Sequence, residues 1–249
     1  MPLRADYLGE TILTFMELIN KVLTAVGQGD DPVIAAVTDT YQLKAAQFVL
    51  DFLEEVEGAA PWRVLRSRVA ATVAANGNSI ALSGVNRKTQ LWYENEEHCQ
   101  RADPLCFDVT NTSAQYALRL MDLATLLRID QEASNTATNA QPSHFAIERT
   151  ATGVTLYVHP RVNTARNIEI DLLVPQAPDL VATDTGDLST DIKVPVLPVQ
   201  YGASWWAMED RGEELGPRGD KAEKRYRDLL ADAVAQEIAE QGFDSLVPQ

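Results

Sequence analysis

The sequence predicts an α+β fold in which a helical domain formed by both chain ends carries an inserted antiparallel β domain. Apolar residues recur at helical spacing near the amino terminus and again over the last fifty residues. From Ser67 to Val174 the pattern changes to the alternation of half-buried strands. Because neither terminal segment can bury its apolar face alone, we expect residues 1–64 and 192–249 to form one domain and residues 65–191 the other.

A capping box marks the first helix. Thr14 and Glu17 have the spacing at which an N-cap hydroxyl and a carboxylate each accept a free backbone N–H. Apolar residues then recur every three or four positions as far as Gly27. After a Gly- and Pro-rich stretch, a second apolar face covers residues 37–56 and ends at Gly58. We expect two amphipathic helices that pair as a hairpin.

Alternating apolar and polar residues indicate strands in the central region. An Asn-Gly pair at Asn76 separates residues 68–73 from residues 80–82, and this pair favours the positive φ of a hairpin turn. Three more strands are expected at residues 145–149, 153–158 and 167–174. The last alternates apolar residues with polar ones such as Asp171, which predicts one face in contact with water.

Three other stretches lack a regular apolar pattern. Residues 94–108 and 131–141 are polar, and we expect them to form loops. Residues 177–191 carry four aspartates and little apolar content. We expect this last stretch to be an exposed arm or linker.

The segment over residues 196–208 is apolar on nearly every side. Read at helical period, Trp206 lies on one face, while Tyr201 and Met208 cover others. A helix of this kind in water has to be buried on both sides. One side can pack on a following helix whose apolar stripe covers residues 226–238. For the other side, a neighbouring subunit is the economical partner.

The segment after this second helix still carries three apolar residues. Helical periodicity is expected to end at Gly242, and the apolar residues beyond it predict a peptide that becomes ordered on a partner surface. The alternative is that they fold back on the chain's own helices. Together, the residues predicted at a subunit or partner interface are Tyr201, Trp205, Trp206, Met208, Phe243, Leu246 and Val247.

The sequence contains no Gly-rich phosphate loop, nucleophile elbow or zinc motif. His98, Cys99 and Cys106 are too few, and the cysteines too far apart, for a structural zinc site. The residue types of a hydrolytic triad occur at Ser143, His144, His159 and Asp171, but nothing in their spacing requires one. We therefore assign no catalytic, cofactor-binding or metal-binding residue and expect an assembly component instead of an enzyme.

Charge and composition restrict the class of partner. A net charge of −15 opposes the counterion release that drives sequence-independent binding to nucleic acid. The acidity serves solubility or provides a surface that DNA passes without sticking. The two cysteines suit a reducing compartment, and the absence of a long apolar run or signal peptide indicates an intracellular protein with no membrane partner.

Four stretches together resemble a known family. They are Phe15-Met16-Glu17-Leu18-Ile19-Asn20-Lys21-Val22-Leu23; Pro61-Trp62-Arg63; the strand block from Gln141 to Ala146 with Leu156-Tyr157-Val158-His159-Pro160 and Ile168-Glu169-Ile170; and Leu197 to Glu213 with Tyr226 to Val234. Their order resembles the head-to-tail connector adaptors of tailed bacteriophages, the group that includes the podophage tail tubular protein A. Gln141 and the turn at Arg161 depart from the family's usual turn residues.

The resemblance implies a structural virion protein that is assembled in the host cytoplasm. Members form a ring, usually twelve-fold, beneath the portal, which joins the capsid to the tail and extends the DNA channel. The implied partners are other copies of the chain, the portal protein and a downstream tail or nozzle protein, while DNA passes through the lumen without specific binding. No cofactor is implied.

Two other functions stay open. One is a β-sandwich tail component that binds carbohydrate or a protein partner, with the helices as an oligomerisation base. Long heptad repeats would favour this function, and the sequence has none. The other is a virion-associated hydrolase, which turnover of peptidoglycan would reveal.

Overall fold

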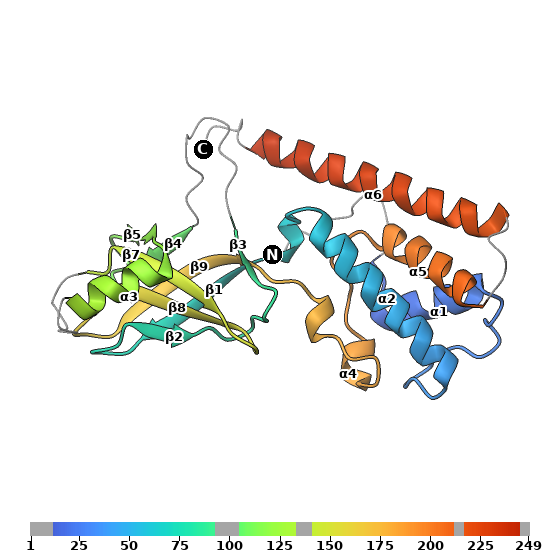
Figure 1. Ribbon diagram of the computed structural model, residues 1–249, viewed down its shortest axis with the longest axis horizontal. Helices are drawn as coiled ribbons and strands as arrows, with labels where there is room; N and C mark the ends of the chain where they lie inside the picture. Colours follow the sequence, from blue (N-terminus) through green and yellow to red (C-terminus); the bar gives the residue numbers. More distant parts are fainter. Residues whose placement is uncertain (1–11, 93–104, 133–140, 212–216, 245–249) are drawn as a thin grey trace. The chain divides into compact units, whose positions relative to one another are not determined.

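The structure consists of two compact units. The computed structural model describes residues 12–92, 105–132, 141–211 and 217–244. Contacts divide these residues into a helical unit, formed by the chain up to Leu65 together with Gln176–Asp244, and a β unit, Arg66–Pro175 (Figure 1). Helices from both ends of the chain thus flank a central β region, which confirms the α+β class. The boundary expected at residue 192 lies instead at Gln176.

The two predicted N-terminal helices are confirmed. α1 (Phe15–Ala25) starts with the capping box, in which Glu17 N donates to Thr14 Oγ1 at 3.2 Å and Thr14 N donates to Glu17 Oε2 at 2.8 Å. α2 (Thr40–Ala59) starts later than its apolar face suggested, because Asp39 caps it by accepting a hydrogen bond from Tyr41 N at 2.7 Å. The two helices contact each other, as expected for a hairpin.

α5 (Val196–Asp210) is the central helix of the helical unit. It packs on α6 (Pro217–Asp244), on α2 and on α1, so three helices of the same chain surround it (Figure 1). The neighbouring subunit expected on its second side is therefore not needed to bury it. Gly202 permits the close approach to α2, since a Cβ atom there would overlap the ring of Phe52. The helix end expected at Gly242 is also wrong, because α6 continues to Asp244.

Residues 177–191 are not an exposed arm. They form η3 (Ala177–Asp179), which contacts α2, and the short helix α4 (Thr185–Leu188), which contacts α1. Leu180, Ala182 and Leu188 are buried. Their spacing follows neither the helical nor the strand period, so the sequence pattern did not reveal them.

Two buried carboxylates fix the points where the chain leaves and re-enters the helical unit. Glu237 of α6 is fully buried and accepts a hydrogen bond from Arg63 N at 2.8 Å, at the start of η2 (Arg63–Leu65). Glu57 of α2 is 7% exposed and accepts hydrogen bonds from Gln176 N at 2.7 Å and Ala177 N at 3.1 Å. Burial raises the pKa of Glu57 to about 7, although these hydrogen bonds act in the opposite direction.

The β unit is a sandwich of two sheets. One has the order β1 (Arg66–Val73), β9 (Arg166–Leu173), β4 (Cys106–Asp108), β5 (Tyr116–Ala117), and β3 (Gln90–Leu91) also pairs with β9. The other has the order β2 (Ser79–Ala81), β8 (Val154–His159), β7 (His144–Arg149), β6 (Arg119–Leu120), and α3 (Leu123–Glu132) packs on β7 and β8. Both sheets contribute to one core, which includes Val73, Phe145, Leu156 and Ile170.

The strands predicted at β7, β8 and β9 are confirmed, but their surroundings differ from expectation. β1 pairs with β9 and β2 with β8, so the turn at Asn76, with φ of 63°, leads the chain from one sheet to the other and closes no hairpin. β6 and β7 are parallel, so the β unit is not purely antiparallel. On the face of β9 expected to be wet, Asn167 is exposed and Glu169 is half-buried, but Asp171 is only 2% exposed.

Both expected polar loops contain regular structure at their ends. β4 lies in the stretch 94–108, and α3 extends into the stretch 131–141. The rest of these stretches, residues 94–104 and 133–140, lies outside the described residues. The short strands β3, β5 and β6 and the helix α3 were not predicted.

The close contact at Gly202 gives the first prediction. Gly202→Ala should lower the free energy of unfolding by about 1 to 3 kcal/mol, because the added methyl group overlaps the buried ring of Phe52. Gly58→Ala, in α2, is the matched control: its Cβ meets no atom within 4 Å, and it should stabilise by up to about 1 kcal/mol. Urea unfolding measures both, and equal effects would contradict the packing described for α5.

The buried Glu57 gives a pH-dependent prediction. Its folded-state pKa is above its unfolded value of 4.5, so its stabilising contribution is complete below pH 4.5 and is lost as the pH rises through about 7. Glu57→Gln keeps an acceptor oxygen but does not ionise. The unfolding free energy of the variant, minus that of the wild type, should increase by about 3 kcal/mol between pH 4.5 and pH 8. A difference independent of pH would show that Glu57 ionises normally.

Candidate interaction site

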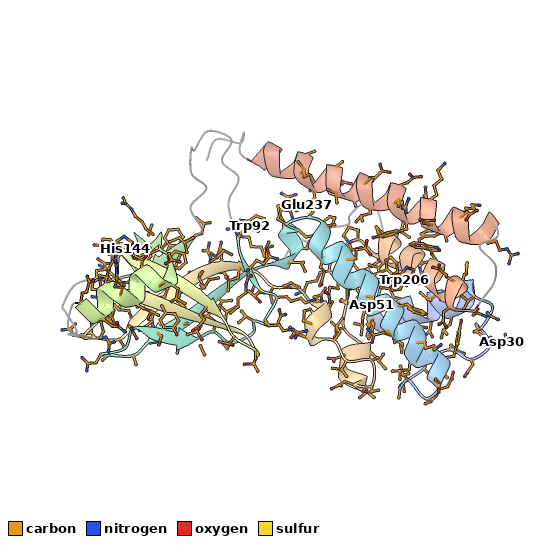
Figure 2. All side chains as sticks on the ribbon, viewed as in Figure 1. Asp30, Asp51, Trp92, His144, Trp206 and Glu237 are labelled. Carbon is orange, nitrogen blue, oxygen red and sulfur yellow. The ribbon has the colours of Figure 1, made fainter. Side chains whose placement is uncertain are left out.

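The residues predicted at an interface on α5 separate onto two sides of the helix. Trp205 and Trp206 face α2, where the Trp206 ring lies 5.1 Å from Phe52 and 6.3 Å from Phe48, between centroids (Figure 2). Trp205 lies 6.3 Å from Phe52. Both tryptophans therefore anchor α5 within the chain. Trp205 is half-buried, and Trp206, with 39% of its surface exposed, is the more exposed of the two.

The remaining predicted interface residues have different positions. Tyr201 and Met208 lie on another side of α5, where they line a pocket. Phe243 belongs to the last turn of α6, although its side chain is not among those described. Leu246 and Val247 lie outside the described residues. The structure thus does not bring the seven residues together into one patch.

The pocket has a volume of about 410 Å³ and lies between the end of α1 and the facing sides of α5 and α6. Its apolar wall includes Tyr201 and Met208 of α5. The side contributed by α6 is basic, with Arg218, Lys221, Lys224 and Arg225, and also contains Asp228. We call this site the basic pocket. It has the size and the mixture of apolar wall and convergent polar groups that binding pockets commonly show.

Several polar groups of the basic pocket have no partner in the described structure. Ser204 is 3% exposed, and its Oγ atom has no hydrogen-bond partner there, nor does Oε1 of Gln200. The four basic side chains form no ion pair with any described residue. Buried polar atoms without partners cost free energy, so a ligand that supplies hydrogen bonds and negative charge would be favoured here.

This pocket was not predicted, because the apolar stripe that indicated the second helix begins only at residue 226. In the structure, α6 begins at Pro217, which places Arg218, Lys221 and Arg225 at helical spacing on one side. A proline at the first helical position, followed by this spacing of cations, was the available signal.

The triad residue types in the β unit do not form a triad. Ser143 Oγ lies 2.9 Å from Nδ1 of His144, but Asp171 is bonded elsewhere. His159, opposite His144 in the register of β7 and β8, has its Nδ1 atom 3.9 Å from Asp130. Burial and the charges of His159 and Arg119 lower the pKa of His144. Among the described residues, no carboxylate orients His144 as a catalytic base.

Asp171 instead holds β1 on β9. Arg66 Nε donates to its Oδ2 at 3.0 Å and Arg68 Nε to its Oδ1 at 2.7 Å, and the Arg66 guanidinium also lies 5.2 Å from the ring centre of Trp92. Burial alone would raise the pKa of Asp171, but the hydrogen bonds and charges of Arg68 and Arg66 outweigh it and hold the pKa below its usual value. This network with Arg66 and Arg68 accounts for the burial of an acidic side chain on β9.

Within residues 12–92, 105–132, 141–211 and 217–244, no group of three or more His, Cys, Asp and Glu side chains is placed to hold a metal ion. Cys106 is buried, and burial raises its pKa, while His98 and Cys99 lie outside these ranges. No helix in the described part is long and apolar enough to cross a membrane.

Comparison with known proteins does not assign a family. No protein-family model matches the chain, and a search of the curated proteins gives no significant match.

The Ser204 hydroxyl, which has no hydrogen-bond partner among the described residues, gives a prediction about stability. Ser204→Ala should raise the free energy of unfolding by about 1 kcal/mol, because it removes a buried group without a partner and favours the helix. Ser189→Ala is the control, because its hydroxyl donates to the carbonyl of Gly186 at 2.8 Å and its loss should destabilise. Thermal unfolding of the two variants measures the difference. Destabilisation by Ser204→Ala would mean that the hydroxyl is already satisfied.

Proposed function

We propose that this protein is a head-to-tail connector adaptor of a tailed bacteriophage. In this proposal it forms a ring beneath the portal, joins the capsid to the tail and extends the DNA channel. The observation that carries the proposal is the helical unit, which both ends of the chain close around α5 while the β unit is inserted between residues 65 and 176. This supports the order of segments on which the resemblance to the adaptor family rests.

The proposed work of the protein is interface formation and not catalysis. Its partners are other copies of the chain in a twelve-fold ring, the portal protein on one side and a tail or nozzle protein on the other. Exposed apolar area at Trp206 and the basic pocket offers contact surfaces on the helical unit. The proposed location is the virion, after assembly in the host cytoplasm.

The net charge of −15 supports a channel that does not bind DNA. A lumen lined by acidic or neutral side chains repels the phosphate backbone, so DNA slides past instead of adhering. The proposal therefore requires no specific DNA contact.

A β-sandwich binding module is the second candidate, and the shared core of the two sheets favours it. In that case the β unit would bind carbohydrate or a protein partner, and the helical unit would serve as an oligomerisation base. Fold alone does not decide between these functions, because sandwiches serve many of them. Binding to the portal protein distinguishes the two candidates.

In this proposal, the apolar peptide after α6 binds the portal and tethers each subunit to it. This tether can be tested with the portal protein encoded in the same genome. Leu246→Asp with Val247→Asp should leave the circular dichroism and melting temperature unchanged but weaken capture by portal particles, because charge replaces the apolar contacts of the peptide. Ser245→Asp with Gln249→Asp is the control, since it adds equal charge at neighbouring polar positions. Density-gradient sedimentation measures capture. Equal capture of the wild type, the Leu246→Asp with Val247→Asp variant and the control would refute the tether. A lower melting temperature of the Leu246→Asp with Val247→Asp variant would support folding of the peptide back on the chain.

A further inference from the structure

The basic pocket is built to receive an acidic partner. Four cations without ion pairs surround it, and the Ser204 hydroxyl, in a residue that is 3% exposed, has no hydrogen-bond partner among the described residues. The four cations thus gather on a chain whose net charge is −15. The chemistry of the site favours a group that combines carboxylates with a small apolar side chain.

The same unit carries a surface with this chemistry. Residues 177–191 contain four aspartates and no lysine or arginine, and Val181 among them is 52% exposed. We call residues 177–191 the acidic segment. Its conformation is fixed, because Asp184 Oδ1 accepts a hydrogen bond from Gly186 N at 2.7 Å and Asp187 Oδ2 accepts one from Val181 N at 2.8 Å. Carboxylates and an exposed apolar side chain are thus presented together by a folded segment.

The pocket and the acidic segment lie on opposite sides of the helical unit. α4 packs on α1 and η3 on α2, whereas α6 lies beyond α5 on the other side (Figure 1). Within one chain the two surfaces cannot meet. Between two copies they can, and such a contact joins unlike surfaces, so that it repeats from copy to copy and closes a ring if the rotation allows.

We propose that the basic pocket binds the acidic segment of a second copy of this chain. This inference rests on the proposed ring function and identifies the contact between neighbouring subunits. Opposite charges at the rim accelerate and orient the encounter, and Val181 enters the apolar part of the pocket beside Tyr201 and Met208. Satisfaction of Ser204 by the partner would offset the cost of its present isolation.

The apolar residues that follow α6 do not explain the pocket within one chain. Asp244 lies about 28 Å along α6 from Arg225, at the rise of an α-helix. Leu246 and Val247 extend at most about 11 Å beyond Asp244. They therefore cannot reach the pocket of their own subunit.

A change of charge on each surface tests the contact. Lys221→Glu with Arg225→Glu changes the formal charge of the pocket side chains from +3 to −1, and Val181→Lys with Asp191→Lys weakens the charge of the acidic segment from −4 to −1. Neither pair of substitutions breaks an ion pair of these four side chains in the described structure. Each double variant should weaken self-association by about tenfold or more, and the protein with all four substitutions should recover part of it, because the introduced lysines can pair with the introduced carboxylates. Lys21→Glu with Arg87→Glu is the control: both residues are exposed, and the change in net charge equals that of the pocket variant.

Sedimentation velocity of the isolated proteins and capture by portal particles are measured separately. Wild-type self-association should weaken between about 50 mM and 500 mM NaCl, where screening shortens the reach of charge. If neither double variant weakened self-association, the inference would be overturned. It would also be overturned if the protein with all four substitutions showed no recovery, and that result would indicate that another anionic group occupies the pocket. Failure of the wild type to bind portal particles, with charge-dependent self-association intact, would reject the proposed function but not this contact.

Discussion

The packing of α5 is the constraint on which the helical unit depends. This helix is apolar on nearly every side, so it has to be enclosed, and three helices from opposite ends of the chain enclose it. The enclosure is tight at Gly202, where α5 meets Phe52 without room for a methyl group. Because α1 and α2 come from one end of the chain and α6 from the other, the unit closes only when both ends are present. The β unit is consequently an insertion between them.

Buried carboxylates complete this arrangement. Glu237 binds the backbone at Arg63, where the chain leaves the helical unit, and Glu57 binds the backbone at Gln176, where it returns. In the β unit, Asp171 binds two arginines of β1. Each of these acids is buried and meets hydrogen-bond donors far away in the sequence, so each specifies a long-range contact that apolar packing alone would leave less well defined.

Local signals in the sequence predicted the elements that depend on local physics. The capping box at Thr14 and the positive φ at Asn76 were both found where expected. The pairing partners of β1 and β2 could not be predicted, because a turn residue determines the local backbone and not the sheet to which each strand belongs. The burial of Asp171 was missed for a similar reason, since its arginine partners lie about a hundred residues earlier. The basic pocket could be predicted only if the first residue of α6 was known. The glycines around Pro217 hid this helix start from the sequence pattern.

In the proposed function, a helical unit closed around α5 assembles into a ring on the portal. Negative-stain electron microscopy of the purified protein, mixed with the portal protein encoded in the same genome, tests this claim most directly. The expected result is a second ring of density, coaxial with the portal and beneath it. Images that contain only bare portal rings and single copies of this protein, at concentrations where both proteins are folded, would contradict it.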